Sequence, residues 1–150
     1  MITNTEDLKN LLKAKGLKPT YQRLKILGFL NSHKDSHPTV EMIYGSLSKR
    51  IPTISMTTVY NTLNAFIQKN LVSAVTITGT EVRYDFTTSN HHHFLCKKCG
   101  RIIDIDVKCP LCEKSDIDGH KLEELHGYIK GICKFCLKKK KDEDKHKINY

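Results

Sequence analysis

The chain has 150 residues, a length that fits one ordinary domain or two very small ones. Hydrophobic residues make up 39% of it and charged residues 27%, a composition typical of globular proteins that excludes disorder along the whole chain. The formal net charge of +9 makes nucleic acid a candidate partner. No apolar run approaches the roughly 20 residues of a membrane span, and the N-terminus shows no secretory signal. We therefore expect a cytoplasmic protein with no membrane partner.

The first half of the chain predicts three amphipathic helices in succession. The first is expected over residues 5–15, with Thr5 as its N-cap and Gly16 just past its end. The second begins after a Thr20 cap, and the third begins at Thr39. In the third helix apolar side chains recur at helical spacing, namely at Val40, Ile43, Tyr44 and Leu47.

A fourth helix is predicted after Ser55, and one of its faces is polar but nearly uncharged. Its buried stripe is formed by Val59, Leu63 and Phe66. The opposite face carries hydroxyl, phenol and amide groups, on Thr57, Thr58, Tyr60, Asn61 and Asn64. Such groups hydrogen-bond to base edges and phosphates, whereas a solvent-facing helix usually carries Lys and Glu. This segment is therefore the candidate recognition helix of a DNA-binding domain.

Two alternating segments follow the fourth helix. Residues 75–78 and 82–86 alternate in polarity around Gly79, which predicts a β-hairpin. Helices that end in a polar-faced helix and continue into a hairpin are typical of a winged helix-turn-helix domain. Residues 1–85 carry 11 Lys and Arg against 6 Asp and Glu, which favours DNA binding. The alternative is a small α+β domain that binds no nucleic acid.

All six cysteines lie after residue 95, in three Cys-x-x-Cys pairs: Cys96/Cys99, Cys109/Cys112 and Cys133/Cys136. In a reducing cytosol, thiols at this spacing are more often metal ligands than disulfides. Two such pairs that converge on one ion form a tetrahedral zinc site, which stabilises a domain too small to bury much apolar surface. Short strands are expected at residues 94–95, 102–107 and 128–132, with the pairs at their ends.

A second group of candidate ligands is rich in nitrogen and oxygen. On a strand, His91 and His93 point to one face and His92 to the other. Together with Asp85 and Asp104 they form a mixed set of imidazoles and carboxylates, which suits Fe(II), Mn(II) or Zn(II). The alternative is a surface histidine cluster without a ligand role.

Several motifs match one protein family in both order and spacing, along nearly the whole chain. They are Lys18-Pro19-Thr20-Tyr21-Gln22-Arg23, His37-Pro38-Thr39, residues 54–63, Tyr84-Asp85, His91-His92-His93-Phe94 and Cys96-Lys97-Lys98-Cys99-Gly100-Arg101-Ile102. On these motifs the chain resembles the ferric uptake regulator (Fur) family of bacterial metal-dependent repressors. The resemblance implies an α+β architecture that acts as a homodimer on palindromic operator DNA and is not an enzyme. A winged-helix DNA-binding domain is expected over residues 1–85, a metal-binding α/β dimerisation domain over 86–137 and a Lys-rich tail over 138–150.

Within the family, the chain most resembles the peroxide-responsive branch. That resemblance implies a regulatory Fe(II) or Mn(II) ion on His37, Asp85, His91, His93 and Asp104, and a structural Zn(II) ion on Cys96, Cys99, Cys133 and Cys136. In this branch Fe(II) reacts with hydrogen peroxide and a ligand histidine is oxidised, here His37 or His91, so that the repressor releases DNA. The iron-responsive branch tends to carry Glu at the positions of Asp85 and Asp104. The alternative within the same fold is a repressor that senses iron, zinc or manganese availability without peroxide chemistry.

The expected DNA interface combines the recognition helix with residues one helix earlier. Its members are Lys18, Tyr21, Arg23, Ser55, Thr57, Thr58, Tyr60 and Asn61, with Lys18 and Arg23 as phosphate contacts. The Cys109/Cys112 pair departs from the family pattern, because it lies where the dimerisation helix normally begins. A zinc site that uses Cys109 and Cys112 therefore remains an alternative. A metal-dependent hydrolase is disfavoured, since no nucleophile or general base stands apart from the metal ligands.

Overall fold

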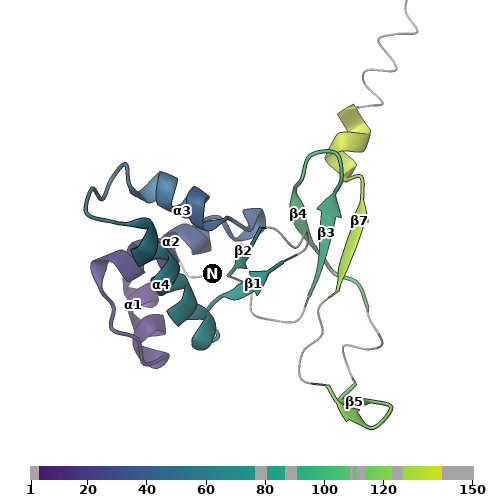
Figure 1. The fold of residues 1–150 in the computed structure, drawn as a ribbon, viewed down its shortest axis with the longest axis horizontal. Coiled ribbons are helices and arrows are strands. Elements are labelled where there is room, and N and C mark those ends of the chain that lie inside the picture. The colour runs from purple at the N-terminus through teal and green to yellow at the C-terminus, as the bar shows by residue number, and fades with distance from the viewer. Residues whose placement is uncertain are drawn as a thin grey trace, which may run out of the picture. The chain divides into compact units, whose positions relative to one another are not determined.

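The computed structural model describes residues 4–76, 81–86, 91–108, 110, 114–122 and 127–139. It divides the chain into two compact units, Met1–Ser89 and Asn90–Tyr150. The first unit is mostly helical and the second is built on a small sheet (Figure 1). This combination confirms the expected α+β fold class. Within the described part of the chain, none of the helices has the length and apolar character needed to cross a membrane.

Four helices build the first unit: α1 (Thr5–Ala14), α2 (Tyr21–Ser32), α3 (Val40–Leu47) and α4 (Met56–Gln68), with a short 3₁₀ helix, η1 (Lys34–Ser36), after α2. Each α-helix begins after a polar side chain that accepts a hydrogen bond from a first-turn N–H. The caps predicted at Thr20 and Ser55 are confirmed. The cap predicted at Thr5 is wrong, because the Asn4 side chain accepts from the Asp7 N–H at 2.8 Å and Thr5 is already helical.

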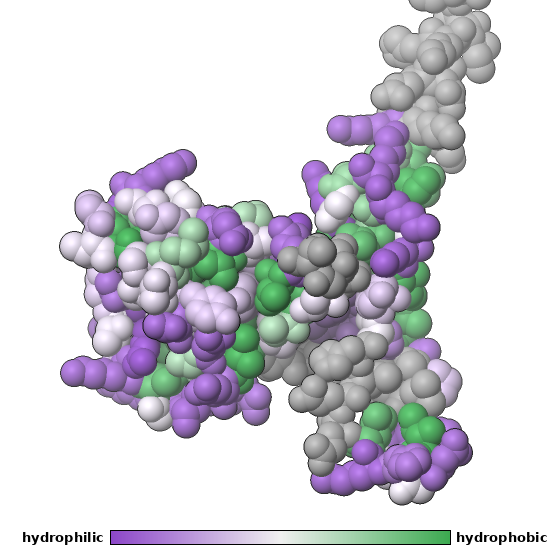
Figure 2. Space-filling model, in the orientation of Figure 1, coloured by the Kyte–Doolittle hydropathy of each residue, from purple (hydrophilic) through white to green (hydrophobic). Residues whose placement is uncertain are grey.

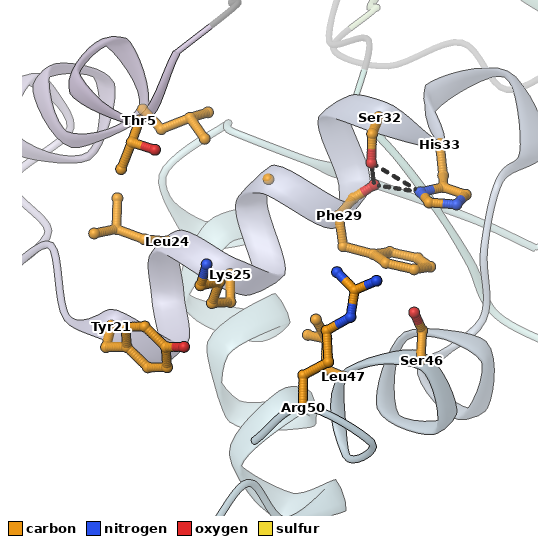
Figure 3. A pocket seen from close by; sticks show the side chains of 12 residues that line it. Thr5, Tyr21, Leu24, Lys25, Phe29, Ser32, His33, Ser46, Leu47 and Arg50 are labelled. Atoms are coloured by element: carbon orange, nitrogen blue, oxygen red, sulfur yellow. Dashed lines mark hydrogen bonds between the residues drawn. The ribbon is translucent and has the colours of Figure 1, made fainter.

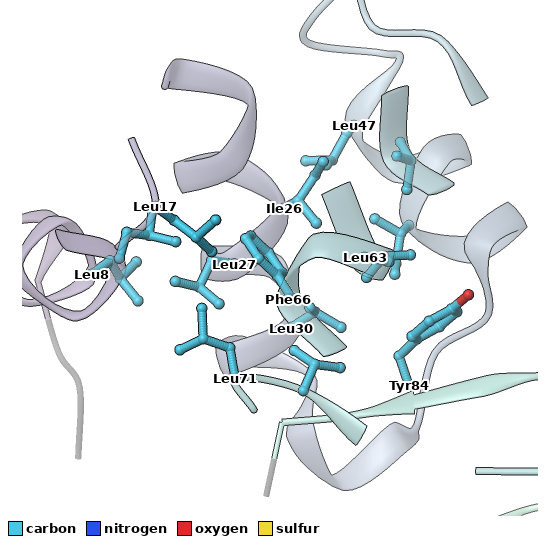
Figure 4. Packing of buried hydrophobic residues seen from close by; sticks show 14 of the residues in the cluster. Leu8, Leu17, Ile26, Leu27, Leu30, Leu47, Leu63, Phe66, Leu71 and Tyr84 are labelled. Atoms are coloured by element: carbon cyan, nitrogen blue, oxygen red, sulfur yellow. The ribbon is translucent and has the colours of Figure 1, made fainter. Parts of the chain in front are cut away.

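The apolar faces of these helices meet in one core (Figure 4). Val59, Leu63 and Phe66 of α4 are fully buried, as their spacing predicts. They belong to the same cluster as Leu12 of α1 and Leu27 of α2. Burying one such side chain contributes about 1.5–3 kcal/mol. The first unit therefore has a hydrophobic core of its own.

A two-stranded hairpin completes the first unit. Strand β1 (Ser73–Val75) pairs antiparallel with β2 (Arg83–Asp85), and Ser73 lies opposite Asp85. The predicted hairpin is confirmed, but its first strand begins earlier than predicted. Because Leu71 and Val72 are buried in the helical core, the chain enters the sheet directly after α4. Residues 77 and 78, which the prediction placed in this strand, lie outside the described residues.

The second unit contains a three-stranded sheet with the order β4-β3-β7. Strand β3 (His92–Cys96) pairs antiparallel with β4 (Ile102–Ile105) and parallel with β7 (Tyr128–Gly131). All three strands match predicted segments. The connection between β4 and β7 includes a small exposed hairpin of β5 (Asp116–Ile117) and β6 (His120–Lys121). Cys109 and Cys112, which belong to the same connection, lie outside the described residues.

Few apolar side chains are buried in the described part of the second unit. Its buried cluster consists of Cys96, Cys133 and Cys136, with Phe94 and Ile103 packed against it. Apolar side chains from β7, the short helix at residues 134–139 and the link between them reach the surface instead (Figure 2); they are Tyr128, Ile129, Ile132, Phe135 and Leu137. Buried thiols thus occupy the place that aliphatic side chains have in the first unit.

Candidate metal centres and nucleic-acid interface

Four cysteines converge in the second unit. Cys96 ends β3 and Cys133 follows β7, and the parallel pairing of these strands sets Cys96 opposite Gly131. All four sulfur atoms, which include those of Cys99 and Cys136, lie within 4.8 Å of one another. The Sγ atoms of Cys96 and Cys136 are 3.9 Å apart, and those of Cys99 and Cys133 are 3.8 Å apart. Tetrahedral zinc with bonds near 2.3 Å requires sulfur separations of about 3.8 Å. The donor set and its spacing therefore fit zinc.

The thiols of this cluster differ in their ease of ionisation. The backbone N–H of Cys133 donates to the Cys96 sulfur at 3.3 Å and lowers the pKa of the Cys96 thiol to about 6. Burial raises the pKa of the Cys136 thiol to about 12, so this thiol stays protonated near neutral pH in the absence of a cation. A divalent ion deprotonates the thiols that coordinate it. Full ionisation of the cluster therefore requires the metal.

His37 and Asp85 form a buried pair in the first unit. His37 lies between η1 and α3, and Asp85 ends β2. Both side chains are 0% exposed, and His37 Nε2 lies 3.8 Å from Asp85 Oδ2. Groups of this polarity are costly to bury unless they are paired or coordinate a metal. The pair supplies one nitrogen and one oxygen donor.

Two histidines and a carboxylate gather in the second unit. His91 Nε2 and His93 Nε2 are 3.0 Å apart, which confirms that both imidazoles share one side of the strand. Asp104 Oδ1 lies 3.3 Å from His91 Nε2 and 3.6 Å from His93 Nε2. The register of β3 against β4 explains this proximity, because it sets His93 opposite Asp104. The second unit thus offers two nitrogen donors and one oxygen donor.

The predicted recognition helix, α4, has the expected polar face in part, because Thr58 and Asn64 are half-buried. Thr57, Tyr60 and Asn61 are exposed, and Tyr60 keeps 52% of its surface accessible. The Ser55 hydroxyl accepts from the Thr58 N–H at 3.0 Å, and the two hydroxyls lie 2.8 Å apart. Ser55 and Thr58 therefore serve the start of the helix, whereas the other three side chains present their polar groups to solvent.

The start of α2 carries the remaining predicted DNA contacts. Arg23 Nη1 donates to the Lys18 carbonyl at 3.0 Å, which anchors the guanidinium to the loop before the helix. Tyr21 is 59% exposed and lines a hollow of about 590 Å³ (Figure 3). Lys25 and Arg50 also line it, and none of the described residues around it is acidic. Neither cation was predicted from the sequence. Lys25 lies four residues after Tyr21, so helical spacing alone predicts that the two side chains share one side of α2. Arg50 follows α3 in the chain, and it lines the hollow only because α3 packs beside α2.

Comparison with known proteins identifies the class to which this chain belongs. Residues 14–126 match the model of the Ferric uptake regulator family. The chain belongs to this family of metal-dependent transcription regulators, and it is not an enzyme.

Several individual proteins are similar to this chain over most of its length. The peroxide-responsive repressor PerR of Staphylococcus epidermidis is 36% identical over 140 residues, and the match covers 87% of this chain and 88% of the relative. Among solved structures, the ferric uptake regulator of Vibrio cholerae has a TM-score of 0.67 at 29% identity and covers 83% of this chain and 98% of its own. The Campylobacter jejuni peroxide stress regulator has a TM-score of 0.62 at 28% identity, and the match covers 90% of this chain and 100% of the regulator.

Proposed function

We propose that this protein is a cytoplasmic, homodimeric repressor that binds palindromic operator DNA and releases it when hydrogen peroxide oxidises a ligand histidine. The observation that carries the proposal is the donor set of three histidines and two aspartates, divided between the units. Support for the peroxide signal comes from relatives such as the Staphylococcus epidermidis protein, whose name describes a peroxide-responsive repressor.

In this proposal, His37 and Asp85 of the first unit and His91, His93 and Asp104 of the second bind one regulatory ion. Each unit supplies only part of the set, so one ion held by both would restrain the two units relative to each other. That restraint would fix the spacing of the two recognition helices in a dimer, and DNA affinity would then be coupled to metal affinity. The chemistry of the donors separates the two metals, because imidazole and carboxylate suit Fe(II) or Mn(II) whereas the four thiolates suit Zn(II).

Bound Fe(II) supplies one-electron chemistry with hydrogen peroxide, which Mn(II) does not readily support. The residues of the chain determine the consequence. In net terms, hydrogen peroxide would oxidise the imidazole of His37 or His91 by two electrons: one peroxide oxygen would be added to the ring and the other would leave as water. The oxidised ring would no longer bind the metal, so the restraint between the units would be lost. An aspartate at position 104 is one methylene shorter than a glutamate, and we propose that it leaves room for peroxide beside the imidazoles.

The DNA-binding role rests on the exposed polar face of α4 and the cations near the start of α2. Tyr60 and Asn61 would contact base edges, while Lys18 and Arg23 would contact phosphates. The exposed apolar side chains of β7 and residues 132–137 provide a surface on which a second copy would pack. Dimers of this kind place their recognition helices about one helical turn of DNA apart, which accounts for a palindromic operator.

The decisive experiment measures operator binding with Fe(II) or Mn(II) before and after peroxide, on an operator selected from random-sequence DNA. Brief peroxide treatment of the Fe(II) form should abolish binding and add one oxygen to the peptide that contains His37 or His91. The Mn(II) form should stay bound, and Asp104→Glu should keep metal-dependent binding while losing most peroxide sensitivity. An Fe(II) form that remains unoxidised on DNA identifies a metal-availability sensor instead. Cysteine oxidation with zinc loss as the first event identifies a thiol switch.

A further inference from the structure

One side chain of the first unit contacts the backbone of a proposed metal ligand without being a ligand itself. Arg83, on β2, donates from Nη1 to the carbonyl oxygen of His37 at 3.3 Å. The same guanidinium pairs with Glu81, from Nε at 3.0 Å and from Nη2 at 2.8 Å. Arg83 therefore joins the loop before α3 to a carboxylate two residues before the second hairpin strand.

The backbone of His37 needs such support. Its φ of 46° and ψ of 67° lie in the left-handed region, which is uncommon for residues that have a Cβ atom. The next residue is Pro38, and a proline favours extended backbone in the residue before it. A conformation that is disfavoured on both counts persists only where its surroundings hold it.

Strand β2 holds this loop at two successive points. The Tyr84 N–H donates to the Pro38 carbonyl at 3.0 Å, directly beside the contact from Arg83 to His37. The residue after Tyr84 is Asp85, whose carboxylate lies 3.8 Å from the His37 imidazole. The strand that supplies one proposed ligand thus also fixes the backbone of the other.

We propose that Arg83 is a positioning residue for the regulatory metal. It holds the His37 carbonyl, keeps the backbone left-handed and so directs the imidazole to its place beside Asp85, while Glu81 fixes the orientation of the guanidinium. The planar fork of arginine makes both contacts at once, which the single ammonium of lysine cannot do with the same geometry. The proposal rests on the assignment of His37 and Asp85 as metal ligands under the proposed function.

The test measures Mn(II) affinity of the full-length, zinc-loaded protein by competition with a chelator. Arg83→Ala should weaken binding about tenfold or more, as is typical for loss of a group that orients a metal ligand. Arg83→Lys should restore only part of that affinity, and Glu81→Gln should cause a smaller loss than Arg83→Ala. Lys9→Ala is the matched control, because it removes an exposed pair with Glu6 in the same unit at 3.0 Å and should leave Mn(II) affinity unchanged.

Two further measurements separate the possible outcomes. The thermal unfolding of the first unit, measured without Mn(II), should be almost the same in Arg83→Ala and Lys9→Ala; a much lower melting temperature for Arg83→Ala would overturn a positioning role in favour of a general structural one. His37→Ala should abolish Mn(II) binding, and parental binding in that variant would refute the ligand assignment itself. Loss of binding in His37→Ala together with parental affinity in Arg83→Ala would refute only the role of Arg83.

Discussion

The two units of this protein are stabilised in different ways. In the first, Leu12, Leu63 and Phe66 belong to a continuous apolar core formed by four helices. In the second, the buried cluster consists of cysteines, while Ile129, Ile132 and other large apolar side chains remain on the surface. The difference suggests a role for the thiols: we propose that this small sheet, with few buried apolar side chains, is stabilised by metal binding at its cysteine cluster.

The physical reason is the scaling of surface with size. The second unit, Asn90–Tyr150, is small enough for hydrophobic burial to exceed the entropy of folding only marginally. A zinc site assembles only when the chain folds, so its binding free energy is also folding free energy. The first unit therefore should tolerate metal loss, and the second should not.

The largest expected effect comes from breaking the second unit alone. Cys96→Ser or Cys133→Ser removes one of the four thiolates of the proposed zinc site; structural zinc in zinc-finger peptides binds with an apparent free energy of about 10–16 kcal/mol. We expect loss of zinc and unfolding of the second unit, with loss of the dimer, while the helical circular dichroism of the first unit persists. Zinc content, dimer mass and circular dichroism check this expectation.

Cys109→Ser is the control for this experiment, and its effect should be much milder. Native zinc content and dimer mass in the Cys96 and Cys133 variants would contradict the assignment. Zinc loss in the Cys109→Ser variant instead would show that the zinc site uses the Cys109/Cys112 pair.

The next largest effect should destabilise the first unit and leave the second unit folded. Phe66 is fully buried in the helical core, so Phe66→Ala leaves a cavity and should destabilise the first unit by about 3–5 kcal/mol. Chemical denaturation followed by helical circular dichroism measures this change, and zinc analysis should show full occupancy. If Phe66→Ala lost zinc in parallel with its loss of helical structure, the two units would not fold independently.

A smaller effect should change DNA recognition and leave the stability of both units intact. Asn61 is exposed on α4, and an asparagine contact to adenine is worth about 1–3 kcal/mol. Asn61→Ala should weaken binding to the specific operator, and Tyr60→Ala should act in the same direction, with unchanged metal content. Titration of specific and random DNA separates this loss from a general one; parental operator affinity in both variants would show that another surface reads the bases.

The smallest expected effect tests a local contact in the first unit. The Asn4 side chain caps α1 through the Asp7 N–H, so Asn4→Ala should lower the stability of the first unit by about 1 kcal/mol. Thr5→Ala should cost much less, since Thr5 is not the cap. A larger loss of stability in Thr5→Ala than in Asn4→Ala would show that Thr5 is the cap, as the sequence predicted.

Much of the fold follows from local sequence patterns. The helical stripe of Val59, Leu63 and Phe66 and the Ser55 cap were predictable, because periodicity and capping depend on residues within one or two turns. Alternation on a strand likewise placed His91 and His93 on one side. The first strand of the hairpin was less predictable, since its start depends on the burial of Leu71 and Val72 against distant helices.

The sequence by itself thus determined the helices, most strands, the cysteine pairs and the family motifs. Only the tertiary structure decided which cysteines meet, because the parallel pairing of β3 with β7 joins segments more than 30 residues apart. It also decided that Arg50 lines the same hollow as Lys25 and that Arg83 donates to the carbonyl of a left-handed His37. These contacts depend on packing between elements far apart in the chain, and no local pattern of side chains records that packing.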